Sequence, residues 1–372
     1  MTTKIKVLNI IGTRPEAVKM APIIKAMESD SAFECTTCAT AQHRELLDQV
    51  LNLFQIKPDI DLDLMKPDQS LSVLTSQILT NLDPVITQLK PDWILAQGDT
   101  TTVMTAALLA YYNRINFGHV EAGLRTFKNF EPYPEEGNRR IAGTIATAHF
   151  APTETAKNNL LRENVSSESI FITGNTVIDA IQSVGTLPIP TELLTLKSEI
   201  GPKKIILVTA HRRENFGEPI RSICTAIATL AQEFKNEIHF VYPVHPNPNV
   251  KEVATKLLKD VPNVSLLQPL DYLPMVHLIK ESYLVLTDSG GLQEEAPGFG
   301  KPVLVMRNVT ERPEGIQAGT VRLVGTKSRQ IEEMVKKLLV DHDDYLSMAQ
   351  AVNPYGDGKA SARIIEVIKN FT

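Results

Sequence analysis

The sequence contains few cysteines and no long hydrophobic run. Three cysteines, Cys35, Cys38 and Cys224, are too few for a disulfide framework and one short of a four-cysteine zinc site. Cys35 and Cys38 fall in one predicted strand, where positions i and i+3 face opposite ways, so we interpret them as core residues. No apolar run approaches the roughly 18 residues that cross a bilayer, and the apolar residues near the N-terminus fit a strand. We therefore expect a cytoplasmic protein without a membrane partner.

An excess of basic charge is also missing. The formal net charge of the 372 residues is −5, and 43% hydrophobic with 22% charged residues is typical of a folded globular protein. Nucleic-acid-binding proteins usually carry a basic face, so we expect no nucleic-acid partner. The fingerprints G-x-G-x-x-G and G-x-x-x-x-G-K-[ST] are absent as well, which argues against NAD chemistry and ATP hydrolysis.

Predicted strands alternate with helical stretches in two series, which is the pattern of parallel sheets covered by helices. The strands are predicted at residues 4–11, 33–40, 92–96, 116–120 and 170–173, and then at 203–210, 237–244, 264–268, 283–287 and 301–306. We predict an α/β protein with two Rossmann-like, doubly wound domains. Their predicted bounds are 1–175 and 203–355, with a proline-rich linker at 176–202 and a terminal helix at 356–372.

One strand ends in the unusual sequence "TDSGGLQEE", which suggests an anion site. Ser289, Gly290 and Gly291 join the strand to a helix N-terminus, where free N–H groups and the helix dipole favour a phosphate that glycine allows to approach closely. We predict a diphosphate site there, with Glu295 holding hydroxyl groups such as those of a ribose. The alternative is a tight turn whose acids only complement the helix dipole.

Two further segments, "GTRPE" and "TERPE", offer cations at the start of predicted helices. Arg14 and Lys19 belong to the first segment and its helix, and Arg312 to the second. Each arginine taken alone fits a surface ion pair better than a ligand contact. Together they favour an anionic ligand.

Three acids and a histidine follow predicted strands or loops and are candidates for proton transfer. Asp99, Glu121 and Glu135 come from the first domain and His211 from the second. Ligands of open α/β sheets bind beyond the carboxyl ends of the strands, so these side chains are placed for general acid or base chemistry.

Each acid also has a structural alternative. Asp99 could cap the helix that follows it, Glu121 could pair with Arg125, and one of the two adjacent glutamates that begin with Glu135 could pair with Arg139. His245 stays undecided. The remaining histidines are interpreted as structural or surface residues: His43, His119, His149, His239, His277 and His342.

The ordered motifs of this chain resemble those of the non-hydrolysing UDP-N-acetylglucosamine 2-epimerase family. The matching segments run from "GTRPEAVKMAP" through "GDTTT", "HVEAGLRT", "PEEGNRR", "HRREN", "TDSGGLQEEAP" and "TERPE" to "NPYGDG". The resemblance covers nearly all of the chain. It implies a GT-B architecture with the active site in the interdomain cleft, a terminal helix that returns to the first domain, and a homodimer.

The resemblance also implies roles for individual residues. The catalytic residues would be Asp99, Glu121, Glu135 and His211. The substrate contacts would come from a larger set: Arg14, Lys19, Leu270, Met275, Ser289, Gly290, Gly291, Glu295 and Arg312. No metal and no other cofactor is implied.

Some positions depart from the family. Met275 stands where phenylalanine is common, and Leu270 where some members have a polar residue; both fall in the segment expected to hold the uracil. Gln42 and His43 match a segment at which some members bind a second substrate molecule, whereas Asp68 stands where regulated members carry a basic residue.

The implied reaction is reversible epimerisation at C2 of UDP-N-acetylglucosamine, which yields UDP-N-acetylmannosamine for surface polysaccharide (capsule) synthesis. It would proceed by elimination of UDP to 2-acetamidoglucal and re-addition. The alternatives are a GT-B glycosyltransferase that uses a UDP-sugar, a hydrolysing epimerase, and a sensor that binds the nucleotide sugar without turnover.

Overall fold

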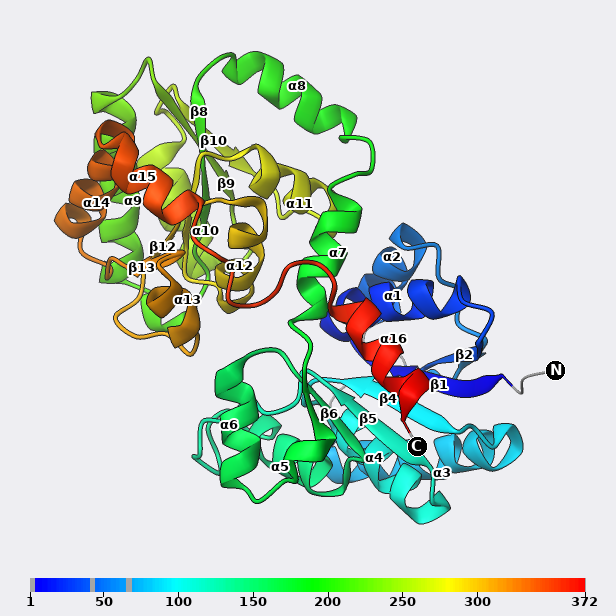
Figure 1. Cartoon of the computed structure of the whole chain (residues 1–372). Coiled ribbons are helices and arrows are strands. Elements are labelled where there is room, and N and C mark those ends of the chain that lie inside the picture. Colours follow the sequence, from blue (N-terminus) through cyan, green and yellow to red (C-terminus); the bar gives the residue numbers. More distant parts are fainter. Residues whose placement is uncertain (1–3, 41–43, 65–68, 372) are drawn as a thin grey trace. The chain divides into compact units, whose positions relative to one another are not determined.

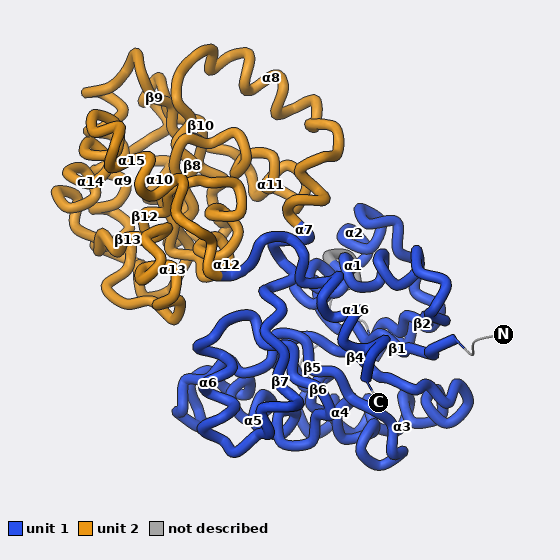
Figure 2. The backbone as a smooth tube through the Cα atoms, viewed as in Figure 1, with its two compact units in different colours: residues 1–180, 355–372 blue, residues 181–354 orange. Residues whose placement is uncertain are grey.

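The computed structural model describes residues 4–40, 44–64 and 69–371 (Figure 1). The chain divides into two compact units, coloured separately in Figure 2. Unit 1 comprises Met1–Ala180 and Tyr355–Thr372, and unit 2 comprises Ile181–Pro354. The first crossing between the units lies within helix α7, in the segment that the sequence analysis assigned to a linker.

Unit 1 contains a seven-stranded parallel sheet in the order β3-β2-β1-β4-β5-β6-β7. The strands are β1 (Ile5–Ile11), β2 (Phe33–Ala39), β3 (Ile60–Asp61), β4 (Trp93–Gln97), β5 (Asn116–Val120), β6 (Ala148–Ala151) and β7 (Ile170–Ile172). The helices are α1 (Arg14–Glu28), α2 (Arg44–Leu53), α3 (Leu71–Leu89), α4 (Thr101–Asn113), α5 (Glu135–Ile145), α6 (Glu154–Arg162), α7 (Thr176–Val184) and α16 (Ala360–Asn370), with a 3₁₀ turn, η1 (Ser167–Ser169). The strand order grows outward on both sides of β1, which is the doubly wound topology.

Unit 2 contains a six-stranded parallel sheet in the order β10-β9-β8-β11-β12-β13. The strands are β8 (Lys204–Thr209), β9 (Ile238–Pro243), β10 (Val264–Leu267), β11 (Leu284–Thr287), β12 (Val303–Val305) and β13 (Val321–Leu323). The helices are α8 (Thr191–Ile200), α9 (Glu218–Glu233), α10 (Pro248–Leu258), α11 (Tyr272–Glu281), α12 (Gly290–Glu295), α13 (Pro313–Ala318), α14 (Ser328–Val340) and α15 (His342–Ala349), with 3₁₀ turns η2 (Arg213–Asn215) and η3 (Ala296–Phe299).

The central strands of both sheets are buried along their whole length. Every residue of β4, β9 and β11 is buried. Helices cover both faces of a doubly wound parallel sheet, so such strands are continuous apolar runs rather than alternating ones. The rigid sheets place the polar loops that follow each strand, where the site residues are found.

The predicted α/β fold class and the ten predicted strands are confirmed, with strand ends within two residues of the predicted ones. The sequence analysis missed β3, β6 and β13. Each is short: β3 has two residues, and β6, "AHFA", lacks the β-branched residues that favour a strand. Within the described residues, the helices are all too short or too polar to cross a bilayer.

Candidate functional site

Glu121 is the most constrained carboxylate of unit 1. It directly follows β5, its backbone has φ of 62°, and its side chain is buried. Left-handed backbone is uncommon outside glycine and often marks functional positions. The carboxylate accepts hydrogen bonds from Lys19 Nζ (2.7 and 2.6 Å), from Asn175 Nδ2 (2.9 Å) and from Gln97 Nε2. These donors compensate the burial of the charge and bring the predicted residues Lys19 and Glu121 together.

Asp99 follows β4, the neighbour of β5 in the sheet, and is held from α5. Arg139 approaches its Oδ2 atom with Nε at 2.9 Å and Nη2 at 2.6 Å. Asn138 Nδ2 donates to the backbone oxygen of Asp99 at 2.9 Å. The N-cap of α4 is Thr100, whose hydroxyl accepts from a backbone N–H of the helix. The alternative in which Asp99 caps this helix is therefore wrong.

Glu135 and Glu136 open α5 and have different surroundings. Glu135 is partly buried, and its Oε2 atom has no hydrogen-bond partner among the described residues. Glu136 is fully buried and accepts from the backbone N–H groups of Thr126 and Phe127, both at 3.1 Å. Glu136 also pairs with Arg139 at 3.3 Å, so the predicted ion pair is confirmed for the second glutamate.

The other alternative, an ion pair between Glu121 and Arg125, is wrong. The guanidinium of Arg125 donates to both carboxylate oxygens of Glu163, at 2.9 and 2.8 Å. Arg125 thus pairs with Glu163, and Glu121 pairs with Lys19.

A further acid, Glu16, supports the turn that carries Arg14, the first residue of α1. Its Oε2 atom accepts hydrogen bonds from the backbone N–H groups of Gly12 (2.5 Å) and Thr13 (3.0 Å). Thr13 and Glu16 form the reciprocal capping box of α1. Burial raises the pKa of Glu16 from 4.5 to about 7, and the two backbone N–H groups act against that rise.

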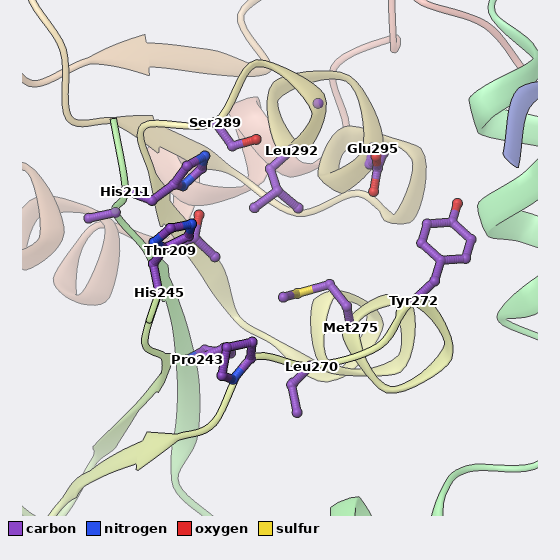
Figure 3. Close-up of a pocket in the computed structure, with 13 residues that line it drawn as sticks. Thr209, His211, Pro243, His245, Leu270, Tyr272, Met275, Ser289, Leu292 and Glu295 are labelled. Atoms are coloured by element: carbon purple, nitrogen blue, oxygen red, sulfur yellow. The ribbon is translucent and has the colours of Figure 1, made fainter. Parts of the chain in front are cut away.

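Unit 2 contains a pocket of about 270 Å³ at the carboxyl ends of β8, β9 and β11 (Figure 3). It is lined by Thr209, Ala210, His211, Pro243, His245, Pro269, Leu270, Tyr272, Met275, Ser289, Gly291, Leu292 and Glu295. Six predicted site residues are among them. In Figure 3 the two imidazole rings lie on one side of the pocket, with Tyr272 and Glu295 on the other.

Asp288, the residue after β11, fixes the histidine side of the pocket. Its Oδ2 atom accepts from the backbone N–H groups of His211 (2.8 Å) and Arg212 (2.9 Å), and its Oδ1 atom lies 3.2 Å from Nδ1 of His211. The ring of His211 stacks on His245, with ring centroids 5.6 Å apart. Burial lowers the pKa of His211 below its usual value, while Asp288 opposes this shift. The neutral imidazole is therefore favoured at neutral pH.

The glycine turn opens α12 at the pocket wall. A Cβ on Gly290 would find only Arg212 Nη2, at 3.5 Å, so the space beside this backbone is open. The two following glutamates diverge. Glu294 is buried and pairs with Arg312, whereas Glu295 lines the pocket.

Some predicted site residues lie outside the described part of the chain: Gln42, His43 and Asp68. Across the residues that the structure does describe, no three histidine, cysteine, aspartate or glutamate side chains are grouped to hold a metal ion. Sequence reasoning missed Glu16 and Asp288 as supports of the site. The Thr-x-x-Glu pattern of residues 13–16 was the available signal for Glu16.

Comparisons with known proteins identify the family of the chain. The family profile described as UDP-N-acetylglucosamine 2-epimerase matches residues 25–369. The Escherichia coli (strain K12) UDP-N-acetylglucosamine 2-epimerase is 54% identical, over 98% of this chain and 98% of the relative. The solved Neisseria meningitidis UDP-GlcNAc 2-epimerase, bound to UDP-GlcNAc, is 48% identical, with a TM-score of 0.84 over 98% of this chain and 100% of that one. The chain belongs to the UDP-N-acetylglucosamine 2-epimerase family.

Proposed function

We propose that this protein interconverts UDP-N-acetylglucosamine and UDP-N-acetylmannosamine by eliminating UDP and adding it back. Its membership of the epimerase family and the substrate bound in the Neisseria relative support this reaction. The observation that carries the mechanism is the set of three carboxylates in unit 1. Asp99 and Glu121 follow adjacent strands, and Glu135 opens the helix whose Arg139 binds Asp99.

In this proposal the pocket of unit 2 binds the UDP part. The backbone N–H groups of Gly290 and Gly291 at the start of α12 and the open space beside Gly290 suit a diphosphate. Glu295 suits the ribose hydroxyls. Leu270 and Met275 give an apolar wall for the flat uracil ring. The neutral ring of His211 can donate a hydrogen bond to the departing phosphate, and Arg14 and Arg312 are the proposed cationic contacts.

The chemistry explains why several carboxylates are needed. The C2 proton of the sugar is next to an amide nitrogen and no carbonyl, so its direct removal would leave a poorly stabilised carbanion. When the bond from C1 to the UDP oxygen breaks, positive charge on C1 acidifies that proton. A carboxylate then takes the proton and 2-acetamidoglucal forms. UDP adds back at C1 while a proton reaches C2 from the opposite face.

Lys19 has a place in the same scheme. Its ammonium group holds the buried Glu121 carboxylate through two short contacts, which orients that carboxylate for proton removal. The proposal needs no metal. It divides the work between unit 2, which binds UDP, and unit 1, which moves protons.

Incubation with UDP-N-acetylglucosamine alone in D₂O tests the proposal. We expect UDP-N-acetylmannosamine and deuterium at C2 of both epimers in the proton NMR spectrum. A glycosyltransferase would give no conversion without an acceptor, a hydrolysing epimerase would release free N-acetylmannosamine, and a sensor would bind without turnover. Product that keeps its original C2 hydrogen would exclude the elimination mechanism.

Two glutamates at the start of α5 and in the loop before it, Glu135 and Glu131, offer a matched pair of variants for this assay. Glu135→Gln should slow exchange at C2 by about two orders of magnitude, the usual effect of removing a general acid or base. Glu131 lies four residues earlier, is exposed and pairs with the surface residue Lys128, so Glu131→Gln should leave the rate unchanged. Equal rates in the two variants would remove Glu135 from the mechanism.

We also propose that the protein is a homodimer, as the family resemblance implies. Support comes from exposed apolar side chains on α3 and α4 of unit 1. Tyr111 and Tyr112, adjacent in α4, are 63% and 65% exposed, and Leu71 and Val73 are exposed at the start of α3. Large exposed apolar patches commonly mark interaction surfaces.

A further inference from the structure

A single arginine, Arg139, connects Asp99, which follows β4, to Glu136 in the first turn of α5. Arg139 uses Nε and Nη2 for Asp99, at 2.9 and 2.6 Å, and Nη1 for Glu136, at 3.3 Å. The guanidinium is planar and rigid, so contacts on two of its edges fix its orientation. Glu136 and Arg139 stand one helical turn apart on α5, where such pairs meet.

Glu136 is itself held with little freedom. Its side chain has no exposed surface, and its two oxygens accept the backbone N–H groups of Thr126 and Phe127, each at 3.1 Å. Phe127 has φ of 61°, a left-handed conformation that the loop must maintain. Glu136 therefore ties the loop after β5 to the start of α5, immediately beside Glu135.

We propose that Glu136 is a positioning residue for the epimerisation, acting on Asp99 through Arg139. This inference rests on the proposed function, because it assigns Asp99 to proton transfer. Glu136 does not touch the substrate in this account. It orients Arg139, which in turn keeps the Asp99 carboxylate in the one orientation that serves proton transfer at C2.

The first test is Glu136→Gln. The amide keeps the shape of the side chain but removes its charge and replaces one acceptor oxygen by a donor, so at least one of its three hydrogen bonds is lost and the ion pair with Arg139 is broken. We expect kcat to fall roughly tenfold or more, because small misplacements of a catalytic group are costly. The KM for UDP-N-acetylglucosamine and the affinity for UDP by calorimetry should stay near wild type, since the UDP contacts lie in unit 2.

A double-mutant cycle distinguishes a positioning role of Glu136 from a merely structural one. If Glu136 acts through Asp99, the Glu136→Gln change should cost little more in kcat once Asp99 is already Asn. Deuterium entry at C2, followed by NMR over long incubations, measures these slow variants. If the fold-losses in kcat of Glu136→Gln and Asp99→Asn simply multiply in the double variant, the inference is wrong.

Arg139→Lys provides a second variant that leaves Glu136 and its loop contacts in place. Lysine keeps a charge beside Asp99 but cannot contact both carboxylates, so kcat should fall in the same way and again show non-additivity with Asp99→Asn. Wild-type kcat in a folded Arg139→Lys protein would contradict the proposal.

The Arg125–Glu163 pair is the matched control. It is another partly buried arginine–carboxylate pair of unit 1, joined by two hydrogen bonds. Arg125 Nη2 also donates to the backbone oxygen of Arg139 at 3.4 Å, and Glu163→Gln changes neither of these two atoms. Glu163→Gln should lower the thermal midpoint and leave kcat unchanged. If Asp99→Asn turns over at the wild-type rate, both the proposed role of Asp99 and this inference are wrong. If Asp99→Asn is slow and Glu136→Gln is normal, only this inference is wrong.

Discussion

At the residue scale, burial makes Glu16 an acid that titrates near neutral pH. Its side chain is buried under the turn between β1 and α1, and this burial raises its pKa to about 7. In the unfolded chain the same group titrates near its ordinary value of 4.5. Between these values the folded state binds more protons than the unfolded state. The free energy of unfolding therefore falls as the pH rises from about 4.5 through about 7.

The variant Glu16→Gln should remove this pH dependence. A shift from 4.5 to about 7 corresponds to about 3 kcal/mol, at about 1.4 kcal/mol for each pKa unit. Denaturant unfolding at several pH values should show that wild type loses stability relative to the variant, by a few kcal/mol between about pH 4 and pH 8. A difference between the two proteins that does not change with pH would contradict the assignment.

The sequence predicts candidate site residues but not the partners that hold them. His211, Ser289 and Glu295 were found because polar residues after buried strands mark ligand sites in parallel sheets, and the structure brings them into one pocket. The partners of Asp99 and Glu121 were not found. Ion pairs join residues distant in sequence, and periodicity says nothing about which of several nearby cations an acid will meet.

At the element scale, α16 is capped by a residue about 180 positions earlier. Asp179, in α7, accepts hydrogen bonds from the backbone N–H groups of Ala360 (3.1 Å) and Ser361 (2.9 Å) and from the Ser361 hydroxyl (2.6 Å). Free N–H groups at a helix start need such acceptors. Because Asp179 is buried, water is poorly placed to replace it.

Asp179→Ala should therefore loosen α16. We expect a loss of about 1–2 kcal/mol, at the upper end for a helix cap, seen as faster hydrogen exchange in α16 measured by mass spectrometry. Asp341 is the matched control, since it caps α15 by accepting from Asp344 N–H at 3.0 Å and is exposed. Asp341→Ala should lower the free energy of unfolding by less than Asp179→Ala does. Equal exchange of α16 in wild type and Asp179→Ala would show that the cap is unimportant.

The sequence predicted strands better than it predicted the segment between the two series. Strands such as β4 and β9 are buried and mostly apolar, a strong signal. Residues 176–202 were assigned to a linker because of their prolines, yet they form α7 and α8, with Pro190 at the N-cap of α8. Proline is tolerated at a helix start, where its missing N–H costs nothing. The prolines therefore marked helix boundaries rather than irregular chain.

At the scale of the whole molecule, the proposed homodimer predicts a mass of about twice 41.1 kDa by light scattering. Replacing Tyr111 and Tyr112 by Ser should shift the mass toward that of one chain, because the two exposed rings give α4 most of its apolar surface. The double change of Phe130 and Tyr133 to Ser removes a comparable exposed pair from the loop before α5 and should leave the mass unchanged. A wild-type protein with the mass of one chain would refute the proposal.

Unit 2 interrupts unit 1 in the sequence, because α16 lies beside α1 in unit 1 while its residues follow all of unit 2 (Figure 1). Translation proceeds from the N-terminus, so the ribosome completes unit 2 before it makes α16. Until then the apolar side chains that this C-terminal segment covers stay exposed. Trp93 is one of them, because its ring packs on that of Phe371, the residue after α16, with ring centroids 4.9 Å apart. A chain that ends at residue 354 would contain all of unit 2 but would lack the last segment of unit 1. Chaperones that bind exposed apolar surface would therefore bind to unit 1, the part of the chain that is made first.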